Sequence, residues 1–331
     1  MLASRRANAM PAAVNPFIDM LRDSTTSADS HTPTEWPTWA LIAIIYGLWI
    51  AAMAWYALQG GVAPWLMLTL VCAWYMSLQH ELVHGHPTRS ARLNRWFGLM
   101  PLAVWYPFDI YRDSHLAHHR DELLTFPGED PESNYMDPPD FAGCSAPMRA
   151  LLVAQRTALG RLCITPAFAI AHLLQDMVRS ATWRKGAKAW SWAQHLGLLA
   201  LVLWGVHAGT GMPMWVYLLC GYFALGLACL RSLYEHRPAA RPAHRIVVNE
   251  AGWFWRLLYL NNNYHAVHHA RPGLPWFAIP AAYRAERDRF VNGTGGFLIP
   301  GYNRFFLRHL FTPVDTPGQA TRELARQDSA A

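Results

Sequence analysis

Four stretches of apolar residues without charge dominate the pattern of the chain. They predict helices at about residues 39–58, 64–84, 190–207 and 212–232. About 20 apolar residues in a helix cross a hydrocarbon core of roughly 30 Å. A buried helix of a soluble protein is the alternative for any one stretch, because core helices also lack charge. Four such stretches in one chain favour membrane spans.

The connections between the stretches pair them into hairpins. The segments QGGVAP (59–64) and AGTGMP (208–213) are short and uncharged, whereas the Lys, Arg, Asp and Glu residues lie on the other side of the paired spans. By the positive-inside rule the charged side faces the cytoplasm, with both termini there. We therefore predict an all-α membrane protein, with four transmembrane helices as two hairpins and a cytoplasmic helical cap.

The composition outside the spans divides the chain into three parts. Residues 1–36 mix Ser, Thr, Asp and Pro, which predicts a flexible N-terminal arm. Residues 37–312 form one membrane domain, and residues 313–331 are predicted to be a disordered tail. Within the domain, the apolar segment 97–111 is interrupted by prolines, so we expect it at the interface or partly embedded. Residues 126–143 form a proline-rich acidic loop.

The formal net charge of +6 raises the question of a nucleic-acid partner. Several basic residues instead flank the predicted spans: Arg89, Arg92, Arg95, Arg184, Lys185 and Lys188. Anionic lipid headgroups are the simpler partner for cations in this position. We therefore expect a lipid bilayer and no nucleic acid as the partner of this charge.

Eight histidines recur at helical spacing near the charged ends of the predicted spans. They form the motifs HELVH, HLAHH and HAVHH: His80 and His84; His115, His118 and His119; His265, His268 and His269. Residues at i, i+3 and i+4 share one face of a helix, so each motif directs its imidazoles to one place. An isolated histidine is usually a hydrogen-bonded core residue, but this repeated spacing is typical of metal ligands.

The metal that suits these motifs follows from the number of imidazoles. HELVH, with Glu81 after His80, also matches the HExxH pattern of zinc proteases. Such a zinc site uses about three protein ligands and one open position, whereas this chain offers eight imidazoles in three motifs. Imidazole is a good ligand for iron, so we predict a di-iron centre. A non-catalytic metal-binding membrane protein would more often carry histidines in low-complexity tracts.

The order of the three motifs around two membrane hairpins resembles the integral-membrane fatty acid desaturase and hydroxylase superfamily, over most of residues 40–290. HELVHGHPTR, YRDSHLAHHRD and NNNYHAVHH look like the bacterial branch of its acyl-chain desaturases. The resemblance implies two histidine-bound irons that activate O2, with electrons from a separate ferredoxin or cytochrome-type donor. It also implies a fatty acid, acyl-thioester or acyl-lipid substrate and a location in the bacterial inner membrane.

The same resemblance implies one more histidine ligand just after the fourth span. His236 in SLYEHR is the candidate, and His86 in HGHP ranks below it because it lies at a predicted helix end. The acyl-CoA desaturases place an asparagine one turn before this histidine, where it holds a metal-bound water. This chain has Ser232 there, which is a departure from the family pattern.

Each ligand imidazole needs an acceptor at its second nitrogen to fix its tautomer. Four carboxylates close to the motifs in sequence are the candidates: Glu81, Asp113, Asp121 and Glu235. A solvated charge at a helix end is the alternative for each of them. Asn261, Asn262 and Asn263 before HAVHH could cap a helix, orient water or hydrogen-bond a ligand, and the sequence leaves these roles open.

One such metal site serves several reactions on an acyl chain. We expect desaturation, with hydroxylation and oxidative decarboxylation to a terminal alkene as alternatives. Membrane-bound fatty acid decarboxylases that make 1-alkenes share similar motifs, and HGHPTRS, YRDSHLAHHRD and LLTFPGEDPES also resemble theirs. Carotenoid ketolases and hydroxylases resemble the chain less. The acyl tail is expected in a cleft between spans, beside side chains such as Trp74, Tyr75 and Trp105.

Overall fold

The computed structural model describes residues 35–182 and 186–328 of the chain. Four of its helices are long and apolar enough to cross a membrane: α2 (Trp36–Gln59), α3 (Ala63–Val83), α10 (Gly186–Thr210) and α11 (Met214–Arg231). This confirms the prediction of a mostly helical protein with four candidate spans. The predicted arm lies outside the described residues up to residue 34, as do Arg184 and Lys185.

The spans pair as two hairpins whose turns are made by glycine. Gly60, Gly61 and Gly211 have φ angles of 60°, 83° and 72°, a backbone region that glycine enters without steric cost. The helices α3 and α11 pack against each other and are the more buried pair. In their most apolar 18-residue stretches, 56% and 44% of the residues are buried. The outer helices α2 and α10 are 28% and 22% buried, so their apolar surfaces face the surroundings, as lipid-facing helices require.

Residues 100–107, the middle of the proline-interrupted segment 97–111, pack against the spans without forming a helix. This stretch connects α4 (Ala91–Leu99) to α5 (Phe108–His118), and residues 101–104 are buried. Its carbonyl groups accept hydrogen bonds from Tyr75 (2.6 Å, to Met100) and Tyr217 (2.9 Å, to Leu102). An unpaired carbonyl in an apolar environment is costly, so these hydroxyls make irregular backbone tolerable there.

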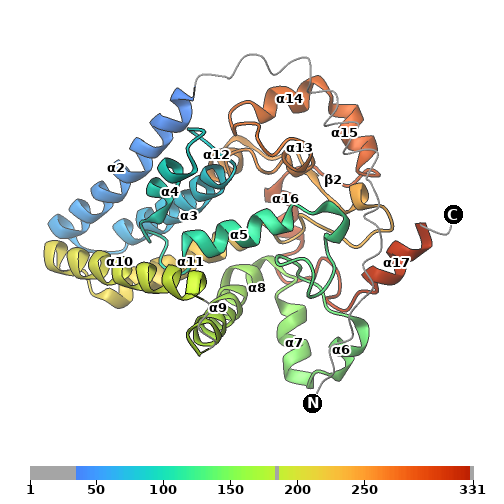
Figure 1. The fold of residues 1–331 in the computed structure, drawn as a ribbon, viewed down its shortest axis with the longest axis horizontal. Helices are drawn as coiled ribbons and strands as arrows, with labels where there is room; N and C mark the ends of the chain where they lie inside the picture. Colours follow the sequence, from blue (N-terminus) through green and yellow to red (C-terminus); the bar gives the residue numbers. More distant parts are fainter. Residues whose placement is uncertain (1–34, 183–185, 329–331) are drawn as a thin grey trace.

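The remaining described elements lie beside the spans and around one end of them (Figure 1). They are η1 (Asp121–Leu123), α6 (Pro138–Gly143), α7 (Ala146–Ala154), α8 (Ala158–Cys163), α9 (Thr165–Thr182), η2 (Pro242–Arg245), β1 (Val248–Asn249), α12 (Trp253–Leu258), α13 (His265–Ala270), α14 (Ile279–Ala285), α15 (Arg287–Gly293), β2 (Leu298–Ile299), α16 (Tyr302–Arg308) and α17 (Thr321–Asp328). The strands β1 and β2 pair in parallel, with Val248 opposite Leu298. A second apolar core, which includes Val248, Val267 and Phe290, holds α13 against this pair.

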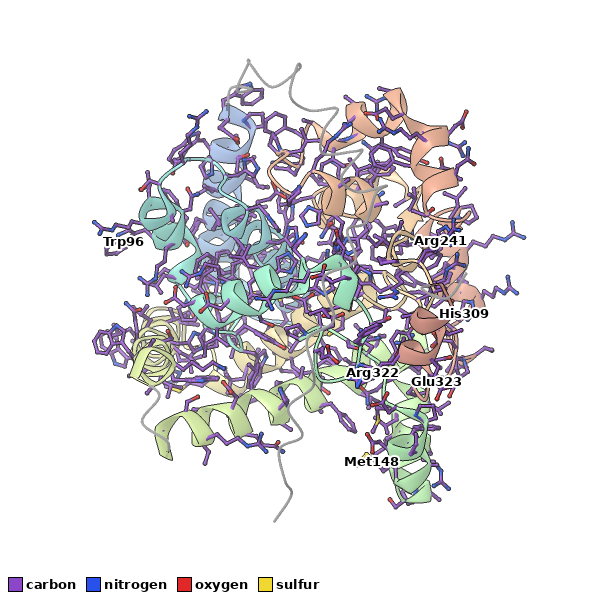
Figure 2. The ribbon with its side chains drawn as sticks, turned by 45° about the vertical axis from the view of Figure 1, so that its right-hand side comes forward. Trp96, Met148, Arg241, His309, Arg322 and Glu323 are labelled. Carbon is purple, nitrogen blue, oxygen red and sulfur yellow. The ribbon has the colours of Figure 1, made fainter. Side chains whose placement is uncertain are left out.

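The segment after α16 crosses the acidic loop and ends in α17, which carries Arg322 beside that loop (Figure 2). Asp315 forms an ion pair with Arg156 at 2.6 Å, and Arg322 donates to the carbonyl of Pro127 at 2.7 Å. The prediction of a disordered tail is therefore wrong for residues 313–328. Its partners lie more than 150 residues earlier in the chain, so local composition does not reveal them.

The ion pair between Arg156 and Asp315 gives a test of this C-terminal attachment. The two side chains are only 3% and 13% exposed, so Asp315→Asn leaves a buried guanidinium without its counter-charge. We expect the free energy of unfolding to fall by about 3 kcal/mol. Thermal unfolding in detergent measures this. The control Glu129→Gln breaks an ion pair of the same segment, with Arg322, that is 47% and 36% exposed, and we expect a change of only about 0.5 kcal/mol. Equal effects would contradict the interpretation.

Candidate metal centre

The three motifs and His236 converge at one end of the helical hairpins. His80 lies in the last turn of α3 and His84 caps that helix, while HLAHH forms the end of α5 and HAVHH forms α13. His236 follows α11 and pairs through an isolated bridge with Ile246, which fixes its backbone. Helix ends and one short bridge thus position all nine predicted ligands.

The nine imidazoles form two groups. In each group, four imidazoles each have a ring nitrogen within 4.8 Å of the others. The first four are His80, His84, His115 and His268, and the second four are His118, His236, His265 and His269. The Nε2 atom of His119 lies 3.1 Å from that of His268 and 3.2 Å from that of His115, so it joins the first group. His86 stays outside, with its Nδ1 atom 2.7 Å from Glu35.

The second group shows why these nitrogens fit a cation. Each of its imidazoles has an acceptor at Nδ1: Asp130 for His118 (2.8 Å), Asp121 for His269 (2.8 Å), the Asn262 amide oxygen for His265 (3.0 Å) and the Arg245 carbonyl for His236 (3.3 Å). A proton on Nδ1 leaves a lone pair on Nε2.

These Nε2 atoms face each other at very short range. The distances are 3.0 Å from His236 to His265, 3.1 Å from His118 to His236 and 3.2 Å from His265 to His269. Among His236, His265 and His269 the Nε2 lone pairs repel at this distance, because no proton remains to bridge them. A bound cation turns the repulsion into coordination, so the donor set fits a metal ion.

Burial keeps most of these imidazoles neutral, as metal binding requires. It lowers the pKa of His84, His268 and His269 well below the usual value, and that of His236 to about 3. His118 differs. Burial also acts to lower its pKa, but the carboxylates of Glu132 and Asp130 outweigh burial and raise the pKa to about 9. A cation that binds at His118 therefore displaces a proton.

The four predicted carboxylates behave differently from one another. Asp121 lies 2.8 Å from the Nδ1 atom of His269, at hydrogen-bond distance. Glu81 lies 3.8 Å from the Nδ1 atom of His80 and accepts a hydrogen bond from the backbone of Trp276 (3.0 Å). Glu235 lies 3.9 Å from the Nδ1 atom of His265 and 3.2 Å from Arg231. Glu81 and Glu235 therefore lie beside candidate ligand histidines but do not form a short hydrogen bond with them.

The prediction for Asp113 is wrong. Its side chain is 69% exposed and pairs with its neighbour Arg112 at 2.7 Å. Two residues along a helix correspond to about 200°, so Asp113 points away from the side of α5 that carries His115. Closeness in sequence does not place it at the site.

Two other carboxylates, which the sequence analysis missed, take that role. Asp130 is buried and also accepts hydrogen bonds from the backbone of Thr125 and of Glu132 (2.9 Å each). Glu132 lies 2.9 Å from the Nδ1 atom of His115. Both belong to the acidic loop that follows HLAHH, and the acidic stretch GEDPES within it is the sequence feature that could have indicated them.

Asn262, whose role the sequence left open, contacts both groups of histidines, through His80 (3.3 Å) and His265.

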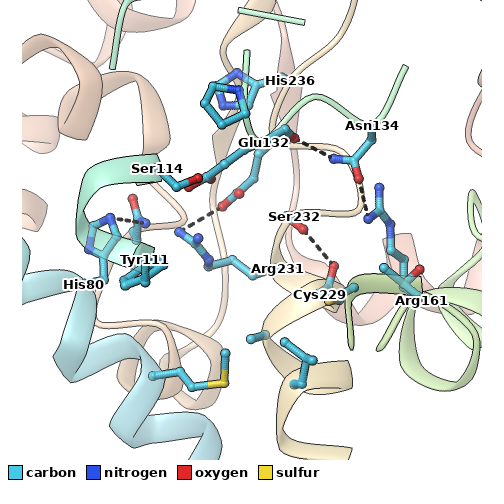
Figure 3. A pocket seen from close by; sticks show the side chains of 18 of the residues that line it. His80, Tyr111, Ser114, Glu132, Asn134, Arg161, Cys229, Arg231, Ser232 and His236 are labelled. Atoms are coloured by element: carbon cyan, nitrogen blue, oxygen red, sulfur yellow. Dashed lines mark hydrogen bonds and ion pairs between the residues drawn. The ribbon is translucent and has the colours of Figure 1, made fainter. Parts of the chain in front are cut away.

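A cavity of about 290 Å³ adjoins both groups of histidines, since His80 and His236 line it. Met76, Leu225 and Ala228, from α3 and α11, contribute apolar wall. Figure 3 shows His80 at one side of this cavity, His236 above it, Arg231 between them and Arg161 at the opposite side. A space beside the metal ligands with an apolar wall can hold an alkyl chain.

The aromatic residues expected beside the acyl tail mostly have other positions. The Tyr75 hydroxyl binds the Met100 carbonyl, and Trp74 donates to the carbonyl of Leu257 at 2.9 Å. Neither residue lines the cavity. Trp105 lines a small adjoining cavity that shares Met76 with the larger one. Small and aliphatic side chains of α3 and α11 take the place that we expected tryptophan to take.

The missed acceptor Glu132 provides a test of the centre. In Glu132→Ala the imidazole of His115 loses the acceptor that fixes its tautomer, so we expect metal affinity to fall about 10- to 100-fold. Competition with a chelator measures the affinity. The control Asp113→Ala removes an exposed carboxylate of the same helix region and should leave the affinity unchanged. An effect of Asp113→Ala as large as that of Glu132→Ala would contradict these assignments.

Comparison with known proteins agrees with this geometry. A family model described as fatty acid desaturase matches residues 60–297, a segment that contains all nine histidines and more than half of the chain. No curated protein matches the chain at a significant level. The chain therefore belongs to the fatty acid desaturase family and is a membrane oxidoreductase.

Proposed function

We propose that the protein is an O2-dependent di-iron enzyme that oxidises a fatty acyl chain. The observation that carries this proposal is the convergence of nine imidazoles, in groups of five and four, beside a cavity with an apolar wall. Two groups suit two metal ions, and imidazole suits iron. Family membership supports the acyl substrate.

The side chains around the centre supply orientation and a dry environment. Asp121, Asp130 and Glu132 hold imidazole protons at Nδ1 and so keep the Nε2 atoms available. Histidine-bound iron would supply what no side chain supplies, the reductive activation of O2. Burial of each CH2 of the acyl chain contributes about 0.8 kcal/mol to binding, so the apolar wall sets which carbon lies beside the centre.

For the outcome we propose a carbon–carbon double bond. Two hydrogens leave adjacent carbons, and O2 combines with them, with two electrons from an external donor and with two protons to give two waters. The donor is a separate ferredoxin or cytochrome-type protein. Hydroxylation at the same centre is the outcome if one oxygen atom returns to the carbon.

Decarboxylation to a terminal alkene is a second candidate, because Arg161 and Arg231 line the same cavity as His80 and His236. Arginines inside the cavity suit a carboxylate near the centre. In this reaction a free acid loses one hydrogen from its β carbon, its carboxyl proton and CO2. One O2 takes these two hydrogens, two electrons from the donor and two protons from water, and two waters form.

We also propose an orientation in the bacterial inner membrane. Both hairpin turns are uncharged, whereas the metal centre and the basic residues lie at the opposite ends of the spans. The positive-inside rule then places the centre, the cap and both termini in the cytoplasm. A cytoplasmic centre is accessible to a soluble electron donor.

Metal content tests the di-iron proposal. We expect about two irons per purified chain, one for each imidazole group. The double variant His268→Ala/His269→Ala removes a ligand from each group and should lose more than half of this iron, as elemental analysis measures. His207→Ala is the control, because His207 lies at the far hairpin turn and contacts the Met212 carbonyl (3.0 Å). An iron content that the double variant leaves unchanged would exclude the proposed centre.

Product analysis tests the outcome. The protein is expressed in a host that supplies a ferredoxin and its reductase, and membrane fatty acids and headspace hydrocarbons are measured by mass spectrometry. We expect new unsaturated acyl chains that are absent with His268→Ala/His269→Ala. Volatile 1-alkenes would instead assign decarboxylation, and hydroxylated chains hydroxylation. Iron-loaded protein that forms none of these from any chain length would contradict an acyl substrate.

A further inference from the structure

Arg161 lies on α8 and forms part of the cavity wall opposite His80 (Figure 3). Its side chain is 2% exposed. One guanidinium nitrogen donates to the amide oxygen of Asn134 at 2.8 Å, while the Nε atom has no hydrogen-bond partner. Across residues 35–182 and 186–328, no carboxylate forms an ion pair with it. The residue is thus a buried charge in contact with a single neutral acceptor.

The neighbouring arginines are compensated. Arg156, five residues earlier in the link between α7 and α8, pairs with Asp315 at 2.6 Å and donates to the Tyr135 hydroxyl at 3.0 Å. Arg231, which also lines the cavity, lies 3.2 Å from Glu235. Asp315 and Glu235, the carboxylates whose charges act on Arg161, therefore already form ion pairs with other arginines.

The two other acidic residues of the wall are engaged by ligand imidazoles. Asp130 accepts from His118 and Glu132 from His115. Among the described charged residues that line the cavity, Arg161 is the one that forms no ion pair.

Such an arrangement is expensive in the absence of a ligand. A buried charge without a counter-charge costs several kcal/mol, and removing a partner from a buried pair costs about 3–5 kcal/mol. Burial, and next the charge of Arg156, lower the pKa of Arg161 to about 10, so the guanidinium keeps its proton at neutral pH. An anion that enters the cavity removes this cost. The planar guanidinium matches a carboxylate in particular.

We propose that the substrate is a free fatty acid whose carboxylate binds Arg161 inside the cavity. A thioester or an ester has no charge at this carbon and leaves Arg161 uncompensated. The cavity of about 290 Å³ is also at the lower end of ligand sites, which leaves little room for a phospholipid head with its second chain. This inference rests on the proposed function and names the substrate class of the same site.

A carboxylate fixed at Arg161 also determines which carbon of the fatty acid lies beside the proposed metal centre. The position of that carbon is then a fixed number of bonds from the carboxyl end, whatever the length of the acid. The methyl end extends along the apolar wall formed by Met76, Leu225 and Ala228.

Ligand binding under argon tests the inference without turnover, so it does not depend on which reaction occurs. Purified full-length protein in detergent is titrated with radiolabelled dodecanoate, methyl dodecanoate and dodecyl phosphate. We expect dodecanoate to bind at least about tenfold more tightly than the ester. Arg161→Gln should weaken dodecanoate about 10- to 100-fold and leave the ester unchanged, because a charge-assisted contact is lost. Arg161→Lys should restore part of the affinity, and Arg308→Gln, an exposed arginine on α16, should have no effect.

Thermal unfolding shows whether the variant is folded. Without ligand, Arg161→Gln should unfold at the same temperature as the unmodified protein or higher, because it removes an uncompensated charge. Dodecanoate should raise the unfolding temperature of the unmodified protein and not that of the variant.

Three results would overturn the inference: equal affinity of the unmodified protein for acid and ester, equal losses of both in Arg161→Gln, or tighter binding of dodecyl phosphate than of dodecanoate. The first comparison needs no variant, so it remains decisive even if Arg161→Gln does not fold. Tight, Arg161-dependent binding of dodecanoate without any oxidised product would contradict the proposed function and leave this inference standing.

Discussion

The repulsion between imidazole lone pairs is the constraint on which the rest of the structure depends. The Nε2 atoms of His236, His265 and His269 approach to 3.0–3.2 Å with the ring protons held on Nδ1, an arrangement that a bound cation stabilises. The fold must therefore bring four chain segments to one point and hold their acceptors in place. Helix ends meet the first requirement because α3, α5 and α13 each place histidines in a last turn.

The second requirement explains the elements that carry no ligand. Asp130 and Glu132 belong to a loop without regular structure, and such a loop needs support from elsewhere. The C-terminal segment supplies it, through a bridge between Met136 and Gly318 and through the pair of Arg156 with Asp315. The irregular segment before α5 is held in the same way, by hydroxyl groups of the spans. The membrane helices thus act as a rigid base for the centre.

Periodic features of the sequence predicted the spans and the candidate ligands. Contacts between segments far apart in the chain could not be predicted from it. Hydropathy located four helices, and the i, i+3, i+4 spacing located eight of the nine histidines, because both patterns are local. His236 has no such pattern and came from family resemblance. Asp113 was assigned to the site because it is close in sequence, although helix geometry turns it outward. The tail after residue 312 depends on partners in distant segments, which composition does not encode. Asp130 lies only 12 residues after His118, but in a loop whose path no helical periodicity predicts.

Charge balance connects the metal centre with the substrate. The carboxylates of the cavity wall contact imidazoles or Arg231, and Asp315 pairs with Arg156. None of the acidic groups in the described residues forms an ion pair with Arg161. A chain that needed only an apolar slot for an alkyl group would gain stability from an uncharged residue at this position. An arginine buried there at a cost is understandable if a ligand brings the missing negative charge. The cavity then selects its substrate by the charge at one end and by apolar contact along the rest.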